Sequence, residues 1–270
     1  MKGRVLIVAG SDSGGGAGIQ ADIKTVTALG GYAATAITAL TAQNTLGVLG
    51  IVPVEPAFVR QQMEAVLGDI GADCIKTGML HDAAIIAAVA DCLDALDEPV
   101  LRVVDPVMLS TSGARLLDPA AVEALRARLI RGAMVLTPNI PEAELLLGRR
   151  IAGIADMEPA ARALRALGPR IVVLKGGHLP GDTVRDVVVD AGERYVLESP
   201  RIATRHTHGT GCTLASAIAT GIAQDMGPRA AIERAHAFVQ QAIRTAPGLG
   251  QGHGPLNHAH GLTGAKSDIA

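Results

Sequence analysis

The 270-residue chain has no tryptophan and only two tyrosines and two phenylalanines. Proteins that hold single-stranded nucleic acid stack its bases on aromatic side chains, so this scarcity argues against such a partner. An excess of either charge is also absent, because 24 lysines and arginines are interspersed with 26 aspartates and glutamates. No basic or acidic surface is therefore expected for nucleic acid or for an anionic membrane. We expect a small-molecule partner instead.

Cysteines are few, and long hydrophobic runs are lacking. Cys74, Cys92 and Cys212 are far apart and include no CxxC pair, which fits neither a disulfide framework nor a zinc site. The N-terminal apolar run, VLIVAG, is too short for a signal peptide. Residues 25–54 carry no charge, but polar residues interrupt them too often for a membrane helix, so we expect burial to explain the missing charge. These absences indicate a cytoplasmic protein without a membrane segment.

Short β-rich runs alternate with helical patterns along most of the chain. The runs are RVLIVAG, YAATAITAL, CIKTG, VLRVVD, AMVLTP, RIVVLKGG and RDVVVD, and helical spacing recurs at 56–69, 82–96, 119–130 and 158–167. This alternation favours an α/β fold with a mainly parallel sheet covered by helices. An antiparallel hairpin is expected in RDVVVDAGERYVLE, followed by helices at 211–224 and 229–245. We expect one domain over 1–262 and a flexible tail at 263–270.

Polar and glycine-rich residues follow these strands, at the carboxyl ends where open α/β sheets bind ligands. They are Asp12 to Gly18, Gln43 and Asn44, Met79, Asp105, Asn139 and Glu142, and Lys175 to His178. We therefore expect one site to gather residues from several strand ends.

The loop after the first strand contains a formal match to the dinucleotide-binding pattern GxGxxA at Gly16–Ala21. A Rossmann site also needs an acidic residue about 20 residues further on. None occurs from Ile23 to Val54. A nicotinamide-dependent oxidoreductase is thus disfavoured, and the loop is either one that approaches a ligand closely or a tight turn without a ligand.

Gln43 and Asn44 lie in an otherwise apolar segment, where an unpaired amide costs about 1–3 kcal/mol. A glutamine donates and accepts hydrogen bonds at once, which suits the edge of a heterocycle. The alternative is a side chain bonded to nearby backbone, and for Asn44 we favour it.

Asp105, Asn139 and Glu142 offer the oxygen ligands that magnesium prefers, usually through water and substrate phosphate. Asn139 is equally suited to capping a helix, and Asp105 to starting a turn. Lys175 precedes two glycines, where its ammonium could meet a phosphate, although an exposed structural lysine has the same pattern.

The stretch HGTGCTLASAIATG combines the small loop residues Gly209, Thr210 and Gly211 with the start of a long helix. The free N–H groups and positive dipole end of a helix form an anion site. The P-loop pattern GxxxxGK[ST] is absent, so this is another kind of phosphate loop. We expect His206 and His208, which flank it, to be structural.

Several of these motifs together resemble the hydroxymethylpyrimidine/phosphomethylpyrimidine kinases of thiamine biosynthesis, which have the ribokinase-like fold. The matching stretches are AGSDSGGGAGIQADIKT, ALTAQNTLGV, KTGML, VVDPVM, TPNIPEAELLL, LKGGHL, THGTGCTLASAIA and GHGPLNH, in order from about residue 5 to 258. The resemblance implies a central sheet with helices on both faces and a homodimer. It also implies phosphorylation of 4-amino-5-hydroxymethyl-2-methylpyrimidine and then of its monophosphate, with ATP and Mg2+.

The resemblance also assigns roles to residues. Gln43 would bind the aminopyrimidine edge in a pocket shaped by Gly10, Ala17, Met79 and Val107. Asp105 and Glu142 would organise magnesium and the ATP phosphates indirectly, with Asn139 in support and Lys175 on the phosphates. Gly209, Thr210 and Gly211 would form the anion hole, and Cys212 would replace the catalytic aspartate of sugar kinases. The flap Leu109–Gly113 lacks the basic residue that the family often has, so a phosphate contact from Thr111 would be neutral.

Two further interpretations stay open at this point. Some relatives with a similar GTGC loop act on vitamin B6, so a pyridoxal or pyridoxine kinase, or dual activity, is the alternative. A non-catalytic pyrimidine-binding protein is disfavoured by the presence of Asp105, Glu142 and Lys175. For Cys212 the helix N-terminus predicts a lowered thiol pKa, although a space-filling role is the alternative.

Overall fold

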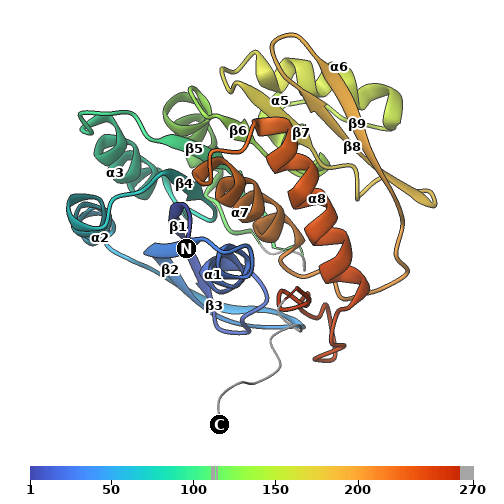
Figure 1. Cartoon of the computed structure of the whole chain (residues 1–270), viewed down its shortest axis with the longest axis horizontal. Coiled ribbons are helices and arrows are strands. Elements are labelled where there is room, and N and C mark those ends of the chain that lie inside the picture. The colour runs from blue at the N-terminus through green and yellow to red at the C-terminus, as the bar shows by residue number, and fades with distance from the viewer. Residues whose placement is uncertain (111–112, 114, 262–270) are drawn as a thin grey trace.

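A computed structural model describes residues 1–110, 113 and 115–261. Nine strands form one sheet in the order β3-β2-β1-β4-β5-β6-β7-β8-β9 (Figure 1). The strands are β1 (Arg4–Asp12), β2 (Tyr32–Asn44), β3 (Gly47–Pro53), β4 (Cys74–Thr77), β5 (Leu101–Val104), β6 (Val135–Leu136), β7 (Ile171–Leu174), β8 (Thr183–Val189) and β9 (Arg194–Pro200). The predicted tail at 263–270 lies outside the described residues, so the domain boundary stays a prediction.

The centre of the sheet is parallel and both of its edges are antiparallel. Strands β2, β1, β4, β5, β6 and β7 pair in parallel, while β3 pairs antiparallel with β2. At the other edge, β8 and β9 form the predicted hairpin, which pairs antiparallel with β7. Strand β3 was not predicted, because Gly47 and Gly50 interrupt its apolar residues and no regular alternation marks it.

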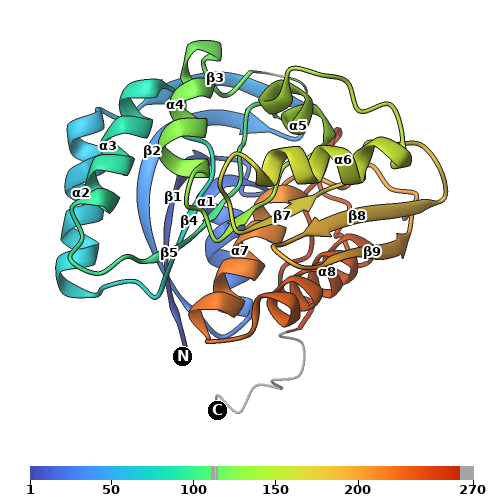
Figure 2. The same cartoon turned by 90° about the horizontal axis from the view of Figure 1, so that it is seen from above.

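Helices cover both faces of the sheet. They are α1 (Gly18–Ala28), α2 (Pro56–Asp69), α3 (Ala83–Asp94), α4 (Val122–Ala124), α5 (Ile140–Leu147), α6 (Ile154–Arg165), α7 (Thr210–Ala223) and α8 (Pro228–Arg244). Figure 2 shows α7 and α8 on the opposite side of the sheet from α2, α3 and α6. Among the described residues, no helix is long and apolar enough to cross a membrane.

Strand β1 shows why the sheet is buried on both faces. Val5 and Ile7 pack in one core with α1, α7 and α8, whereas Leu6 and Val8 pack in the other core with α2, α3 and α6. Successive side chains of a strand point to opposite faces, so an uninterrupted apolar run serves both layers. The predicted mainly parallel α/β fold with two helical layers is confirmed.

One local expectation was wrong and a second was met only in part. The segment 119–130 is not one regular helix, because a 3-10 turn (Pro119–Ala121), α4 and a π-helix (Leu125–Ile130) follow one another. Burial explains only part of the uncharged stretch at 25–54, in which Val26, Ala36 and Ala39 are fully buried. The side chains of Leu49 and Val52 in that stretch are 78% and 64% exposed.

Candidate active site

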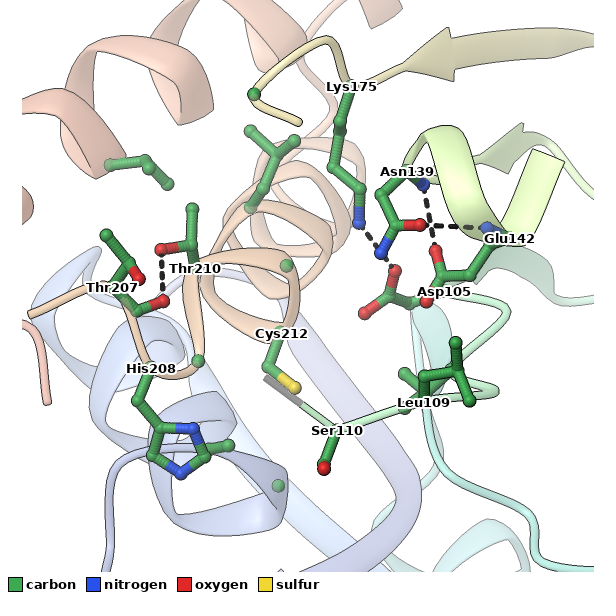
Figure 3. Close-up of a pocket in the computed structure, with 18 of the residues that line it drawn as sticks. Asp105, Leu109, Ser110, Asn139, Glu142, Lys175, Thr207, His208, Thr210 and Cys212 are labelled. Carbon is green, nitrogen blue, oxygen red and sulfur yellow. Dashed lines mark hydrogen bonds and ion pairs between the residues drawn. The ribbon is translucent and has the colours of Figure 1, made fainter. Parts of the chain in front are cut away.

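A cavity of about 520 Å³ opens at the carboxyl ends of the parallel strands (Figure 3). Within the described residues, the cavity is lined by every residue to which the family resemblance gave a binding or catalytic role: Gly10, Ala17, Gln43, Met79, Asp105, Val107, Asn139, Glu142, Lys175, Gly209, Thr210, Gly211 and Cys212. Their convergence follows from the parallel sheet, which brings its carboxyl ends to one edge. Asn44, which the strand-end rule also placed at the site, does not line it. The individual roles stay predictions.

Charged groups gather where β5 and β7 end. Lys175 Nζ donates to Asp105 Oδ1 at 3.1 Å, and Thr137 Oγ1 donates to the same oxygen at 2.9 Å. The Lys175 side chain is only 13% exposed, so the interpretation as an exposed structural lysine is wrong. Burial lowers the pKa of Lys175, but the charges of Asp105 and Glu142 outweigh it and the net pKa is raised. The ammonium is therefore charged at neutral pH.

Asn139 and Glu142 form a capping box at the start of α5, as the alternative interpretation of Asn139 predicted. Asn139 N donates to Glu142 Oε2 at 2.8 Å, and Glu142 N donates to Asn139 Oδ1 at 2.9 Å. Burial raises the pKa of Glu142 to about 7, Lys175 opposes this shift, and the charge of Asp105 adds to it. A carboxyl that titrates near neutral pH thus faces the cavity.

The glycine-rich loop before α7 has room only for glycine at one position and is tightly packed at a second. Gly209 precedes α7 with φ +81°, and a Cβ there would lie 1.9 Å from the carbonyl oxygen of Gly16. A Cβ on Gly211 would lie 3.0 Å from Lys175 Nζ. The first turn of α7 therefore lies against the charged groups, and the hydroxyl of Thr210 donates to the carbonyl of Thr207 at 2.7 Å (Figure 3).

Cys212 lies in the first turn of α7, between the loop and the acidic groups. The expectation of a lowered thiol pKa was wrong: burial raises the pKa of Cys212 to about 12. Lys76 opposes this shift, while the charges of Asp22 and Asp105 add to it. Burial and the two acidic neighbours therefore keep the thiol neutral at physiological pH.

A buried ion pair beneath Cys212 was missed from the sequence. Lys76 Nζ donates to both carboxylate oxygens of Asp22, at 2.9 and 2.8 Å, and both side chains are fully buried. Ser216, one turn after Cys212, donates to Asp22 Oδ1 at 2.7 Å. Burial lowers the pKa of Lys76, but the charge of Asp22 helps to raise it overall. Asp22 and Lys76 lie 54 positions apart, and no motif joins them.

A second group joins the two glycine-rich loops. Asp12, at the end of β1, accepts hydrogen bonds from the backbone N–H groups of Gly14, Gly16 and Ala17 at 2.8–3.0 Å. His208 Nε2 lies 2.8 Å from Asp12 Oδ2. Burial alone would raise the pKa of Asp12, but the His208 contact and the backbone N–H groups together outweigh burial. The net pKa is lowered, so the carboxyl is ionised at neutral pH.

His208 also reaches the predicted substrate side chain, since its Nε2 lies 3.1 Å from Gln43 Nε2. The expectation that it is structural is incomplete, because its ring lines the cavity. Asn44 fulfils the structural alternative, because its Oδ1 accepts from the backbone N–H groups of Leu46 and Gly47.

The wall beyond Lys175 comes from β8, from β9 and the segment that follows it, and from α8, and it was also missed. Its residues are Val184, Asp186, Pro200, Ile202, His236, Val239, Gln240 and Ile243. Asp186 accepts from the backbone N–H of Gly176 at 2.9 Å, and a Cβ on Gly176 would lie 2.0 Å from the carbonyl oxygen of Arg185. This packing fixes the chain just after Lys175. No sequence pattern announces such a mostly apolar wall.

The sequence profile of the phosphomethylpyrimidine kinase family matches residues 12–257. The chain belongs to this family. It is 47% identical over 258 residues to the hydroxymethylpyrimidine/phosphomethylpyrimidine kinase of Streptomyces coelicolor, covering 96% of this chain and 95% of that protein. It is 55% identical to the thiamine biosynthesis bifunctional protein ThiED of Geobacter sulfurreducens, covering 95% of this chain. The match spans only 52% of that bifunctional protein.

Solved structures of kinases resemble this family member closely. The Bacillus subtilis pyridoxal kinase, solved as an ADP complex, has a TM-score of 0.89 at 36% identity and covers 96% of this chain and 98% of its own. The phosphomethylpyrimidine kinase of Clostridium difficile has a TM-score of 0.79 at 40% identity, covering 90% and 100%. The ribokinase-like fold is confirmed. Thr111 of the flap lies outside the described residues, so its neutral phosphate contact stays a prediction.

Proposed function

We propose that the chain transfers phosphate from ATP to 4-amino-5-hydroxymethyl-2-methylpyrimidine, and then to the resulting monophosphate to form the diphosphate. The observation that carries the proposal is the division of one cavity between an amide-bearing wall and a charged wall, with the phosphate loop between them. Membership of the phosphomethylpyrimidine kinase family supports the same reaction.

Gln43 binds the aminopyrimidine edge in this proposal, because its amide can donate and accept side by side. Gly10 leaves room for the ring, since a Cβ there would lie 3.0 Å from Met79 Sδ. Ala17, Met79 and Val107 complete a wall of small and aliphatic groups. An aromatic ring can thus be held without aromatic side chains.

Lys175 and the first turn of α7 receive the phosphates. Helix N-terminal N–H groups and an ammonium both stabilise the charge on a transferring phosphoryl group. Gly209, Thr210 and Gly211 give the backbone close access. Phosphoryl transfer depends mainly on positioning and charge neutralisation, so Cys212 can assist the alcohol as a neutral thiol without becoming a base.

Magnesium would be held by Asp105 and Glu142 through water and ATP phosphate, with Asn139 fixing Glu142. Among the described residues, no group of three or more His, Cys, Asp or Glu side chains could enclose a metal ion. Two carboxylates beside a phosphate site nevertheless suit magnesium, which keeps waters and substrate oxygens as ligands. When bound, the ion would neutralise charge on the transferring phosphate.

The decisive experiment incubates the protein with ATP, Mg2+ and the pyrimidine alcohol, and follows phosphorylated products by 31P NMR. We expect the monophosphate first and the diphosphate later. Gln43→Leu should raise the KM of the alcohol by about tenfold or more, because the paired ring edge loses its partner. The KM of ATP should stay the same, and exposed Gln61→Leu on α2 is the matched control. Failure of wild type to phosphorylate the alcohol would refute the proposal.

A second substrate, pyridoxal, is favoured by a specific observation. The Staphylococcus aureus pyridoxal kinase, solved in complex with pyridoxal, has a TM-score of 0.88 at 34% identity and covers 96% of this chain. The same assay with pyridoxal as acceptor shows whether the protein phosphorylates the pyrimidine alcohol alone or both compounds. We expect the pyrimidine alcohol to have the higher kcat/KM.

A homodimer formed through β2 and β3 completes the proposal. Leu40 and Val52 face each other across these strands, and both are more than half exposed, as is neighbouring Leu49. Apolar side chains at a sheet edge favour burial against a second copy. Sedimentation should give twice the chain mass, and Leu49→Lys should give monomers while exposed Leu145→Lys on α5 should not. A monomeric wild type would refute the homodimer.

The three free cysteines suit a reducing cytoplasm, our proposed location.

A further inference from the structure

The amide of Gln43 lies between two polar side chains. Its Nε2 lies 3.1 Å from His208 Nε2, and its Oε1 lies 3.3 Å from Thr41 Oγ1. A glutamine amide can turn by 180° about its last side-chain bond, which exchanges the positions of oxygen and nitrogen. The protons on the two neighbours therefore decide which end faces which neighbour.

His208 Nε2 must carry a proton. It lies 2.8 Å from Asp12 Oδ2, and Asp12 already accepts three backbone N–H groups. A carboxylate surrounded by donors is held in its ionised form, which can only accept. Because His208 Nε2–H donates to Asp12, it cannot accept a hydrogen bond from the Gln43 amide nitrogen. That contact would place a donor against a donor.

The contact between Thr41 and Gln43 has the opposite mismatch, because it places an acceptor against an acceptor. The Thr41 hydroxyl donates to the carbonyl of Ser11 at 2.9 Å, which is shorter than its 3.3 Å contact with Gln43 Oε1. A hydroxyl has one proton, so it presents a lone pair to Gln43. If the Gln43 amide is turned by 180°, both contacts become hydrogen bonds. The amide nitrogen then donates to Thr41 Oγ1, and the amide oxygen shares the N–H of His208 with Asp12.

We propose that His208, held by Asp12, is a positioning residue that keeps the Gln43 oxygen toward His208 and the nitrogen toward Thr41. Each end of an amide has two hydrogen-bonding positions, so one N–H and one lone pair remain for a ligand. This pair matches a ring nitrogen beside an exocyclic amino group. It does not match pyridoxal, whose ring carries no amino group. The inference rests on the proposed function and names the substrate edge that the enzyme recognises.

The packing of His208 supports this role. The residue is 8% exposed, and its backbone N–H donates to the carbonyl of Gly254 at 3.2 Å. A Cβ on Gly16 would lie 2.5 Å from His208 Cδ2, so the ring fits closely against the first glycine-rich loop. A fixed ring holds a neighbouring amide in one orientation far better than a mobile ring does.

The first test uses the protein without substrates, so it is independent of the proposed function. Selective 15N labelling of histidine reports which imidazole nitrogen is protonated, and the His208 signals are assigned by their loss in His208→Gln. We expect a proton on Nε2. A bare Nε2 with the proton on Nδ1 would mean that Gln43 donates to His208, and the proposal would be wrong.

The second test compares kcat/KM for the pyrimidine alcohol and for its analogue without the amino group, 5-hydroxymethyl-2-methylpyrimidine. His208→Leu should reduce the preference for the amino compound by about tenfold, the effect of an amide left without its orienting partner. His208→Gln keeps an N–H donor near the Nε2 position and should retain most of the preference. Thr41→Val, which removes the hydroxyl, and Thr41→Ser, which keeps it, form a second matched pair of variants for the same comparison.

A merely structural role would give a different result. If His208→Leu lowered kcat/KM equally for both pyrimidines, or raised the KM of ATP as much as that of the alcohol, the positioning role would be refuted. If wild type phosphorylated neither pyrimidine, the proposed function would fail, and the tautomer measurement would still decide the arrangement of Asp12, His208 and Gln43.

Discussion

The two ends of the cavity hold different kinds of polar group. At the proposed acceptor end, formed by Gly10, Ala17, Gln43, Met79 and Val107, the residues are uncharged. At the proposed phosphate end, Asp105, Glu142 and Lys175 bring three ionisable groups together under the first turn of α7.

The nearest acidic group at the acceptor end, Asp12, is used differently from those at the phosphate end. Its carboxylate accepts three backbone N–H groups and contacts His208, so its charge is balanced within the loop. Asp105 and Lys175 instead neutralise each other at the edge of the cavity. We therefore expect the acceptor end to select by shape and hydrogen-bond direction, and the ion pair at the phosphate end to exchange partners when phosphates bind.

This division suits two successive acceptors. The first is a neutral alcohol and the second is a phosphate monoester. Two unit charges 4 Å apart interact by about 4 kcal/mol at an effective dielectric constant near 20. A fixed negative charge beside the acceptor would therefore penalise the second step. The neutral thiol of Cys212 and the amide of Gln43 carry no such charge.

Lys175→Met should have the largest effect on kcat/KM, because it removes the positive charge from the phosphate end. It removes the ammonium that, in our proposal, meets the phosphates, and it leaves Asp105 and Glu142 facing each other in a buried site. We expect kcat/KM to fall by about 1,000-fold, as for other lost electrostatic contacts to a transition state. Steady-state kinetics of both phosphorylation steps would measure this.

Loss of folding would mimic this result, because removing one partner of a buried ion pair costs about 3–5 kcal/mol. The double variant Lys175→Met/Asp105→Asn removes both charges and should recover part of the lost melting temperature but none of the activity. Recovery of activity in the double variant would contradict the assignment of Lys175 to the phosphates.

Glu142→Gln should have the next largest effect, about 100-fold on kcat/KM, because a carboxylate at the proposed magnesium site is replaced by a neutral amide. Its more specific consequence is on pH dependence. The wild-type pKa of about 7 means that Glu142 is protonated below neutrality. We expect kcat/KM to rise through pH 7 to a plateau, and this rise should be absent in Glu142→Gln. A rise that persists unchanged would assign it to another group.

The same carboxyl gives a stability prediction of opposite sign. Its pKa is raised above the ordinary value of 4.5, so the folded protein keeps a proton that the unfolded chain releases. Its contribution to stability is complete below pH 4.5 and is lost as pH rises through about 7. Urea unfolding between these pH values should show this slope in wild type and a smaller one in Glu142→Gln.

Sequence reasoning succeeded where the information was local. Apolar runs and helical spacing predicted the sheet and its covering layers, and the rule for strand ends gathered the site residues into one cavity. It failed where distant segments meet. The thiol pKa of Cys212 depends on burial, Lys76 and Asp22, and none of these is visible from its position at a helix start. The role that we propose for His208 depends on its contacts with Asp12 and Gln43, which are distant in the sequence.

Adding a methyl group at either end of the cavity tests whether the two ends have different functions. Gly10→Ala places a Cβ 3.0 Å from Met79 Sδ, and Gly211→Ala places one 3.0 Å from Lys175 Nζ. Both neighbours are flexible side-chain ends that can move, so we expect losses of about tenfold rather than misfolding. Gly10→Ala should raise the KM of the alcohol, whereas Gly211→Ala should lower kcat with ATP. Identical kinetic changes in the two variants would remove the functional distinction between the ends.

Cys212 lies where the two ends meet, and its replacement should have the smallest effect. A neutral thiol can offer the alcohol one weak hydrogen bond, so Cys212→Ala should slow the first phosphorylation by about fivefold, roughly 1 kcal/mol. The second step should change little, because a phosphate acceptor is already ionised and needs no such help. Cys212→Ser keeps a hydrogen-bonding group and is the matched control. Because burial raises the thiol pKa to about 12, iodoacetamide should modify Cys212 more slowly than an ordinary exposed cysteine at pH 8. Rapid alkylation would mean that the thiol is ionised at this pH. Equal slowing of both steps would contradict a specific role of Cys212 toward the alcohol.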